Sequence, residues 1–274
     1  MSEGFSVPVA HISSRENPLV KELRRLSQGS TAYRKQGRVW LEGDHLCRAA
    51  LERGIKPVLA VFAESFWPLA RQLWGQAAIK NIVISDALLP EISGLESPAR
   101  MGFVMDLPAQ EPLLPGADCV ILDRVQDAGN VGSILRSAAA FGFGQIVALK
   151  GTAALWSPKV LRSGMGAHFG LRLLEGVELE ALAGLQVPIV VTSSHQGQFL
   201  HQLTDINALA MPCAWALGHE GQGVRQELIH QASLKVRIDQ PGGQESLNVA
   251  AAAAICLYAS SLCRPPQGTM VVNR

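Results

Sequence analysis

The chain has 274 residues, of which 48 % are hydrophobic and 17 % charged, a composition that excludes a disordered protein. Its formal net charge is +1, so any basic surface for nucleic acid must be local. The five cysteines form no C-x-x-C pair, which excludes the common zinc and redox motifs, and we expect no bound metal. The apolar run 249–259 is shorter than the about 20 residues that span a bilayer, and the start of the chain lacks a signal-peptide pattern. We therefore expect a cytoplasmic protein without a membrane segment.

The first predicted helix lies in residues 13–38, where leucines recur at helical spacing after Pro18. This segment holds seven basic and two acidic residues, so its net charge of +5 exceeds that of the whole chain. Two interpretations stay open: an ordinary solvated helix face, or an arm that contacts phosphate groups. In the second case we expect RNA contacts from Arg15, Lys21, Arg24 and Arg25.

Residues 39–107 alternate between short apolar runs and helical patterns, which predicts a small α/β domain with helices on a sheet. Strands are expected at 39–41, 57–63, 81–84 and 102–107, and helices at 43–53, 67–78 and 86–92. Three prolines and a glycine then interrupt residues 108–117, where neither a helix nor a strand can continue. We therefore predict an N-terminal domain at 1–107, a linker at 108–117 and a second domain at 118–274.

The second domain repeats the alternation. Strands are expected at 119–122, 145–149, 188–192, 213–217 and 234–238, and helices at 131–141, 157–165, 224–231 and 246–262. The strands are apolar throughout instead of alternating with polar residues, which is typical of a parallel sheet covered by helices on both faces. The predicted fold class is α/β.

Three polar stretches lie where an apolar run meets a helical pattern: Asn-Val-Gly-Ser-Ile-Leu-Arg at 130–136, Gly-His-Glu-Gly-Gln-Gly at 218–223, and Glu-Ser-Leu-Asn-Val at 245–249. Such junctions gather at one edge of an α/β sheet, so we expect the three stretches to form one site. The chain lacks a P-loop, a complete dinucleotide fingerprint, H-E-x-x-H and G-x-S-x-G. These absences argue against nucleotide hydrolysis, dinucleotide binding, zinc proteases and α/β-hydrolases.

Each stretch has a plain and a chemical interpretation. Arg136 is either a surface residue or, four residues after Gly132, a cation near a helix N-terminus that favours anions. The glycines around Glu220 either make a turn or bring backbone amides close to a ligand, although a turn does not need the acid. Ser246 is a good N-cap for the last helix, and capping alone explains its presence. It does not explain Asn248, whose side chain offers both hydrogen-bond donors and acceptors in the first turn.

Together and in this order, the three stretches resemble the three motifs of the SpoU (TrmH-like) RNA ribose 2′-O-methyltransferases, members of the SPOUT superfamily. The flanking segments 138–142 and 157–162 resemble the family as well, and the likeness covers about residues 115–262. The N-terminal segments 12–21 and 41–43 resemble the L30e/L7Ae-like substrate-binding domain of members that act on large ribosomal RNA.

The resemblance implies a mostly parallel sheet threaded into a trefoil knot, an obligate homodimer, and S-adenosylmethionine as cofactor. The catalytic positions that it implies are Arg136, Glu220, Ser246 and Asn248. The implied cofactor contacts are Thr192, Gly218, Ile238, Leu247 and Asn248, and the implied RNA contacts in this domain are Asn130 and Arg136. The chain departs from the family pattern at Ala128, where proline is frequent, and at Asp239-Gln240, where proline and a hydrophobic residue are usual. The second departure is expected to alter the rim of the cofactor pocket.

The implied activity is methylation of a ribose 2′-hydroxyl in structured RNA, with ribosomal RNA as the expected substrate and tRNA as the alternative. A non-catalytic RNA-binding protein on the same fold is disfavoured by the retained Arg136, Glu220 and Asn248, and a small-molecule methyltransferase by the basic segment 13–38. Because a guanidinium keeps its proton at ordinary pH, we expect Arg136 to stabilise the developing alkoxide instead of acting as the base. The sequence does not identify the methylated nucleotide.

Overall fold

A computed structural model describes residues 7–193, 196–205, 209, 211–242 and 247–263. The chain forms two compact units, Met1–Ala109 with Ala154–Gly170, and Gln110–Ala153 with Leu171–Arg274. The segment Ala154–Gly170 packs with the first unit although it lies between two strands of the second. Each unit has its own sheet and its own hydrophobic core.

The first unit is built on a five-stranded sheet with the order β1-β4-β3-β5-β2. Its strands are β1 (Val9–Ile12), β2 (Arg38–Glu42), β3 (Leu59–Ala63), β4 (Lys80–Ile84) and β5 (Met101–Asp106). Its helices are α1 (Pro18–Gln28), α2 (Ala32–Gln36), α3 (Asp44–Glu52), α4 (Trp67–Trp74), η1 (Asp86–Leu88), α5 (Leu89–Ile92), α7 (Pro158–Gly164) and η2 (Ala167–Gly170), where η denotes a 3-10 helix. The predicted small α/β domain is confirmed, and β1 is an additional edge strand.

The basic segment 13–38 forms two helices. Asn17 caps α1, because its side chain accepts a hydrogen bond from the Leu19 amide at 2.9 Å, and proline follows in the first turn. The apolar side of α1 is buried through Val20, Leu23 and Leu26. The chain then turns at Gly29 and continues as α2, so five of the seven basic side chains are divided between two short helices, while Arg15 precedes α1 and Arg38 begins β2.

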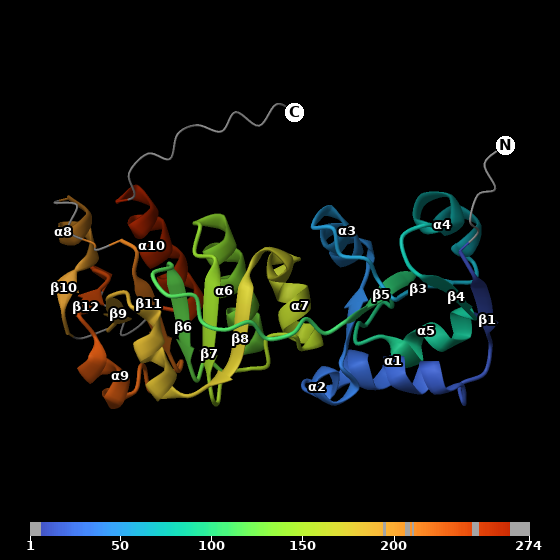
Figure 1. The fold of residues 1–274 in the computed structure, drawn as a ribbon, viewed down its shortest axis with the longest axis horizontal. Helices are drawn as coiled ribbons and strands as arrows, with labels where there is room; N and C mark the ends of the chain where they lie inside the picture. Colours follow the sequence, from blue (N-terminus) through green and yellow to red (C-terminus); the bar gives the residue numbers. More distant parts are fainter. Residues whose placement is uncertain (1–6, 194–195, 206–208, 210, 243–246, 264–274) are drawn as a thin grey trace, which may run out of the picture. The chain divides into compact units, whose positions relative to one another are not determined.

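The second unit is built on a seven-stranded sheet with the order β10-β12-β9-β11-β6-β7-β8, in which every pairing is parallel (Figure 1). Its strands are β6 (Cys119–Asp123), β7 (Gln145–Leu149), β8 (Arg172–Val177), β9 (Ile189–Thr192), β10 (Gln198–Phe199), β11 (Ala214–Gly218) and β12 (Leu234–Arg237). Its helices are α6 (Ala128–Ala140), η3 (Leu179–Leu185), α8 (Leu200–Asp205), α9 (Gln226–Gln231) and α10 (Val249–Leu262). The predicted parallel sheet is confirmed.

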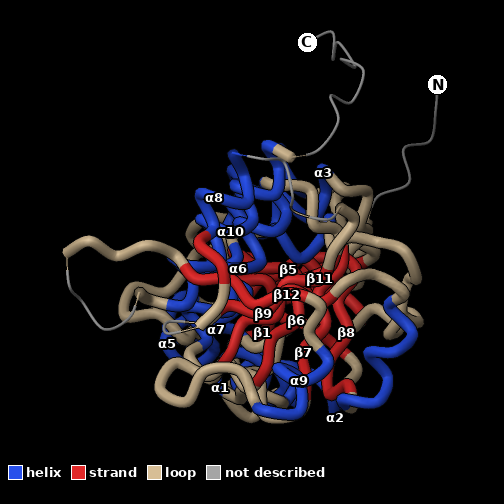
Figure 2. Tube along the Cα trace, turned by 90° about the vertical axis from the view of Figure 1, so that its left-hand side faces the viewer, coloured by secondary structure: helices blue, strands red, loops and turns tan. Residues whose placement is uncertain are grey.

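Both faces of this sheet are covered, which explains why its strands are apolar at successive positions. On one face, Ile121 and Ala216 belong to a core that includes Leu182 of η3 and Leu228 of α9. On the other face, the Trp215 indole donates a 2.8 Å hydrogen bond to Ser260 Oγ of α10, which also contacts α6. Figure 2 shows α10 above and α9 below strands β9, β11 and β12. Among the described helices, none combines the length and hydropathy of a membrane span.

Candidate active site

The carboxyl ends of β12, β9, β11 and β6 meet at one edge of the second sheet, because these neighbouring strands run parallel. Gly218 at the end of β11 is in register with Asp123 at the end of β6, and Thr192 at the end of β9 is in register with Val236 of β12. Ile238 follows β12 directly and is half-buried. Three predicted cofactor positions, Thr192, Gly218 and Ile238, therefore lie at the edge where open α/β sheets bind ligands.

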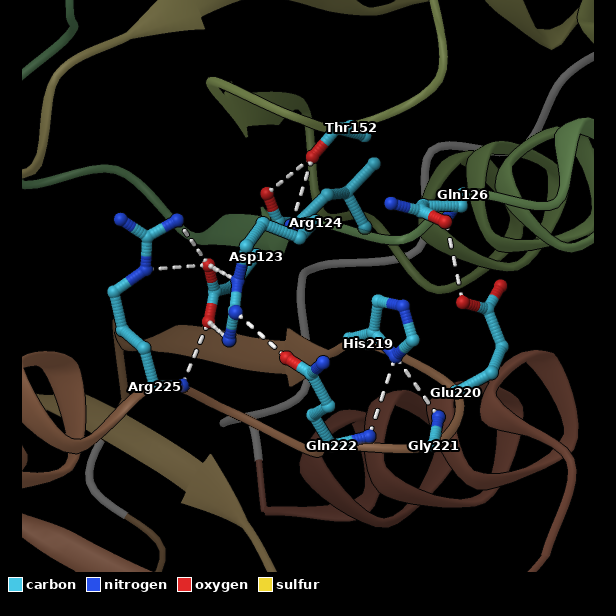
Figure 3. Close-up of polar contacts among 10 residues, drawn as sticks. Asp123, Arg124, Gln126, Thr152, His219, Glu220, Gly221, Gln222 and Arg225 are labelled. Carbon is cyan, nitrogen blue, oxygen red and sulfur yellow. Dashed lines mark hydrogen bonds and ion pairs between the residues drawn. The ribbon is translucent and has the colours of Figure 1, made fainter.

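The loop after β11 closes tightly on itself (Figure 3). His219 and Gly223 exchange two backbone hydrogen bonds of 3.1 and 2.8 Å, and His219 Nδ1 accepts another from the Gly221 amide at 3.0 Å. A Cβ on Gly218 would lie 2.1 Å from the carbonyl carbon of Gly223, so a larger residue does not fit there. The glycines thus serve a turn, and Glu220 lies at its tip.

The Glu220 carboxylate binds the start of α6. Its Oε1 accepts hydrogen bonds from the Asp127 amide and from Asn130 Nδ2, both at 3.1 Å, and its Oε2 accepts one from the Gln126 amide at 3.2 Å. Partial burial raises the pKa of Glu220, but the hydrogen bonds from Asn130 and from backbone amides outweigh it, so the net pKa is below the ordinary value. Glu220 is therefore an ionised group that holds α6, not a proton donor at neutral pH.

Asn130 connects this carboxylate to the last helix. While Asn130 Nδ2 donates to Glu220, Asn130 Oδ1 accepts a 2.9 Å hydrogen bond from Asn248 Nδ2. One residue from each of the three sequence stretches thus takes part in a continuous chain of hydrogen bonds. The expected meeting of the three stretches is found in the structure, through Glu220, Asn130 and Asn248.

The start of α10 differs from the prediction. The helix begins at Val249, and its N-cap is Asn248, whose Oδ1 accepts hydrogen bonds from the amides of Ala250 at 2.9 Å and Ala251 at 3.2 Å. The prediction of a helix from 246 with Ser246 as its cap was therefore wrong. Asn248 prevails because its extended backbone ends the loop and its oxygen reaches two free amides. Ser246 itself lies outside the described residues.

Arg136 lies on the exposed side of α6, and none of the described residues forms a hydrogen bond or ion pair with its guanidinium. The helix begins at Ala128, three residues before the predicted start, because Asp127 Oδ1 caps it by accepting from the Asn130 amide at 2.8 Å. Gly132, four residues before Arg136, is buried in α6. Arg136 is thus an unpaired cation on the helix that Glu220 and Asn248 hold.

The match with known families now decides the identity of this fold. The sequence model of the SpoU rRNA Methylase family matches residues 118–258, which is more than half of the chain. The chain belongs to the SpoU rRNA methylase family. A second model, the MRM3-like substrate binding domain, matches residues 17–101, and the resemblance stated from the motifs is confirmed in both parts.

Full-length relatives of this SpoU protein are found among sequences and structures. An uncharacterized tRNA/rRNA methyltransferase of Synechocystis sp. is 32 % identical over 91 % of this chain and 93 % of its own length. The 23S rRNA (guanosine(2553)-2′-O)-methyltransferase RlmP of Bacillus subtilis is 29 % identical over 90 % of this chain and 97 % of its own. The crystal structure of an AdoMet-bound rRNA methyltransferase from Sinorhizobium meliloti superposes with a TM-score of 0.78 and 26 % identity, covering 92 % of this chain and 97 % of that one.

The SpoU site contains a buried charge cluster that the motif spacing did not reveal (Figure 3). Asp123 has no exposed side-chain surface, and it accepts hydrogen bonds from the Arg225 amide and from Arg225 Nε, both at 2.7 Å. Arg124 Nε approaches the same carboxylate at 3.2 Å, while Arg124 Nη1 donates to Gln222 Oε1 at 3.0 Å. The cluster therefore holds the part of the loop that follows Glu220, at Gln222 and Arg225, against the end of β6. An acid that ends an otherwise apolar run was the available sequence signal.

Burial raises the pKa of Asp123, but hydrogen bonds from Arg225 and Arg124 outweigh it, and the net pKa lies below the ordinary value. Arg124 has a φ of 59°, which is uncommon for a residue other than glycine. Its amide donates to Thr152 Oγ1 at 3.1 Å, and this hydroxyl in turn donates to the Leu122 carbonyl at 2.8 Å. These bonds hold the Arg124 side chain beside the loop.

The remaining predicted residues of the SpoU protein are placed as follows. Leu247 is 39 % exposed and lies directly before Asn248. In the first unit, Arg15 and Arg24 both pair with Glu91, Lys21 pairs with an acid of its own segment, and Arg25 is exposed. Within the described ranges, no group of three or more His, Cys, Asp and Glu side chains is arranged to hold a metal ion.

Proposed function

We propose that this protein transfers a methyl group from S-adenosylmethionine to a ribose 2′-hydroxyl of RNA, and that its substrate is ribosomal RNA. Membership of the SpoU rRNA methylase family supports the reaction, and the name of the full-length relative RlmP supports both the ribose position and the substrate. The observation that carries the proposal is the hydrogen-bond chain Glu220–Asn130–Asn248, because it joins the three motifs into one site.

The carboxyl edge of the sheet suits the proposed cofactor, which would be held by Thr192, Gly218, Ile238, Leu247 and Asn248. Two residues after Ile238, the buried Gln240 Oε1 has no hydrogen-bond partner among the described residues, so it offers an acceptor to an amino group such as that of adenine. The departure from the family pattern at Asp239-Gln240 is therefore compatible with cofactor binding. S-adenosylmethionine supplies a methyl group on a cationic sulfur, and its transfer to a hydroxyl leaves a neutral thioether and releases one proton.

Arg136 would stabilise the ribose oxygen as it loses its proton. A guanidinium stays protonated at any ordinary pH and offers several N–H donors in one plane, which suits an oxygen that becomes negatively charged. Because no described residue pairs with Arg136, its donors are not already committed to the protein. The same cation could contact a neighbouring RNA phosphate and thereby place the ribose.

Glu220, Asn130 and Asn248 would act as positioning residues. Glu220 remains ionised and accepts three hydrogen bonds from the start of α6, and both amide atoms of Asn248 are engaged. The helix that carries Arg136 is therefore fixed against the cofactor edge and against α10. Positioning of this kind contributes several kcal/mol to catalysis, up to about 7 or more in favourable cases.

The proposal includes a homodimer, a trefoil knot and a cytoplasmic site of action. A row of exposed apolar side chains on α10, Ile255, Tyr258 and Leu262, recurs at spacings of three and four residues and supports packing against a second copy. The position of β11 between β9 and β6 supports the knot, since this strand enters the sheet beside two strands that precede it in the chain. Action on ribosomal RNA supports the cytoplasm.

Transfer of tritiated methyl groups from S-adenosylmethionine to total RNA, with and without ribonuclease, tests the proposal. We expect label in ribosomal RNA that ribonuclease releases, and a block to alkaline cleavage at the modified ribose. Label confined to tRNA would mean that the substrate is tRNA instead of ribosomal RNA. Label in small molecules would mean that the substrate is not RNA. RNA binding without any transfer would identify a non-catalytic protein and contradict the proposal.

A further inference from the structure

The basic side chains of residues 13–38 fall into two groups in the structure. Arg15 and Arg24 share the carboxylate of Glu91, with Arg15 Nη2 at 3.2 Å from Glu91 Oε1, and Lys21 Nζ lies 2.6 Å from Glu16 Oε2. Further along, the Arg38 guanidinium lies 3.2 Å from Glu22, and that of Arg34 lies over the Tyr33 ring. These cations are already engaged inside the first unit.

Arg25 and Lys35 form the second group. Both are exposed, and neither has a hydrogen-bond or ion-pair partner among the residues that the structure describes. Arg25 also lies on a different side of α1 from the Glu91-bound Arg24, because one residue corresponds to a turn of about 100° around the helix. The local positive charge predicted for this segment is therefore concentrated on two side chains.

These two side chains line the same groove, which lies between α1 and α2 and has a volume of about 630 Å³. α1 contributes Arg24, Arg25 and Gln28, α2 contributes Ala32, Lys35 and Gln36, and Gly29 lies in the turn between the helices. On α2, Lys35 and Gln36 come three and four positions after Ala32, so both lie on the side of the helix that Ala32 faces. The groove combines two free cations, two side-chain amides and the aliphatic stems of long residues.

We propose that the α1/α2 groove binds the sugar-phosphate backbone of the RNA substrate through Arg25 and Lys35, whereas Arg15, Lys21 and Arg24 stabilise the first unit. The two cations suit phosphate oxygens, and the Gln28 and Gln36 amides can donate to and accept from ribose hydroxyls. An acidic peptide shares the negative charge but lacks the regularly spaced hydroxyls. The proposal rests on the proposed function, since that function supplies the RNA.

The dependence of RNA affinity on salt separates the two groups of cations. A cation that contacts phosphate releases counterions from RNA, and for single strands the slope of log affinity against log salt changes by about 0.7 for each contact. A cation that is already paired with a carboxylate of the protein contributes little to this slope. The double substitution Arg25→Gln/Lys35→Gln and its matched control Arg15→Gln/Lys21→Gln each remove two positive charges from the same segment.

The experiment measures the binding of a labelled oligouridylate and of deproteinised ribosomal RNA to the full chain over a series of salt concentrations. We expect Arg25→Gln/Lys35→Gln to lower the oligouridylate slope by about 1.4, from two contacts of about 0.7 each, and to weaken binding roughly tenfold at low salt. The control should keep the slope of the unmodified protein. Arg25→Lys/Lys35→Arg retains both charges and should have the salt slope of the unmodified protein. Circular dichroism verifies that all variants are folded.

Equal slopes for the double variant and its control would overturn the groove assignment. The assignment would also be overturned if Arg25→Gln/Lys35→Gln lost binding to polyglutamate but kept its binding to RNA, because the groove would then recognise an acidic peptide. Methyl transfer by the unmodified protein is measured on the same ribosomal RNA. If methyl transfer is present but the salt slopes of the double variant and its control coincide, the groove assignment fails and the proposed function stands. If methyl transfer is absent but the two slopes differ, the groove assignment stands and the proposed function fails.

Discussion

The Asn248 side chain donates a 2.9 Å hydrogen bond to Asn130 across 118 residues of sequence, while its own oxygen caps α10. One amide therefore stabilises a helix and joins two motifs of the site. The two tasks use different atoms, Oδ1 for the cap and Nδ2 for the bridge, and can be separated by substitution.

Substitution of Asn248 should separate stability from activity. Asn248→Ala removes both interactions, so we expect a loss of about 1 kcal/mol in the free energy of unfolding together with a loss of methyl transfer. Asn248→Ser keeps a capping oxygen but has no amide donor for Asn130. Its free energy of unfolding should therefore equal that of the unmodified protein, while its rate of methyl transfer should still be low. Urea unfolding and single-turnover transfer check these outcomes. Full activity of Asn248→Ser would show that the bridge has no role in positioning.

Substitution of Arg136 should affect the chemical step. Arg136→Lys keeps the charge but loses the planar set of donors, and we expect kcat to fall about 100-fold with little change in cofactor or RNA affinity. Arg71→Lys, on the exposed side of α4, is the matched control and should have normal kcat. Steady-state kinetics and equilibrium binding provide the measurements. An Arg136→Lys protein with full kcat would contradict the stabilising role of the guanidinium.

Two glycines of the same loop should respond differently to alanine. A Cβ at Gly218 would lie 2.1 Å from the backbone of Gly223, so Gly218→Ala must displace the loop that carries Glu220. We expect it to cost about 2–3 kcal/mol and most of the transfer activity. At Gly221 the nearest contact of a Cβ would be the His219 ring at 3.8 Å, an ordinary distance, so Gly221→Ala should be tolerated. Thermal unfolding and the rate of methyl transfer are measured for both variants. Equal effects of Gly218→Ala and Gly221→Ala would refute the claim that only Gly218 lacks room for a Cβ.

Asp123 should contribute pH-dependent stability. The pKa of Asp123 is lower in the folded than in the unfolded chain. Its contribution to the free energy of unfolding is therefore complete above the pKa of the unfolded chain, about 3.9, and is lost as the pH falls through the pKa of the folded chain. Asp123→Asn should therefore cost about 3 kcal/mol at pH 7, because it leaves two guanidinium groups without their carboxylate, and this difference should narrow below about pH 4.

Urea unfolding over a pH series measures the Asp123 contribution. Asp106→Asn is a suitable control, since that side chain is 75 % exposed and its contact with Arg38 is 3.9 Å long. We expect the control to change the unfolding free energy by less than about 1 kcal/mol. A difference between Asp123→Asn and the unmodified protein that stays constant from neutral to acidic pH would argue against the ionised clamp.

The exposed row on α10 predicts the oligomeric state. Ile255 and Leu262 are 40 and 62 % exposed, and burial in a second copy would explain this apolar surface. Ile255→Asp should shift the mass measured by sedimentation equilibrium from dimer to monomer. Leu69→Asp, at another exposed apolar position with 53 % exposure, should leave the mass unchanged. A dimer that survives Ile255→Asp/Leu262→Asp would place the interface elsewhere.

The central strands could be predicted from sequence because they are continuously apolar, as in β6, β7, β9 and β11. The edge strands β1 and β8 were missed for the opposite reason: they are only partly buried, and Arg172–Val177 includes a glycine and two charged residues. Strands of this kind depend on their pairing partner, which is distant in sequence, so their local pattern is weak.

The members of the site were predictable, but their connections were not. Spacing and family resemblance indicated Glu220, Asn130 and Asn248, yet nothing in the sequence specifies which amide nitrogen donates to which oxygen. The choice between Ser246 and Asn248 as cap depends on where the loop becomes helical, which local propensity does not resolve. The Asp123 clamp depends on Arg225 from 102 residues later, so its partner could be found only in the fold.

The order of the three motifs along the chain has a consequence for biosynthesis. A ribosome that has just completed β12 has already produced Arg136, Glu220 and Asn130, but not the residue that joins them to the last helix. Docking of α10 against α6 is therefore the event that completes the arrangement. A nascent chain can fold its first unit, with the basic groove, well before this event. Synthesis thus makes the proposed RNA-binding groove between α1 and α2 available earlier than the complete site.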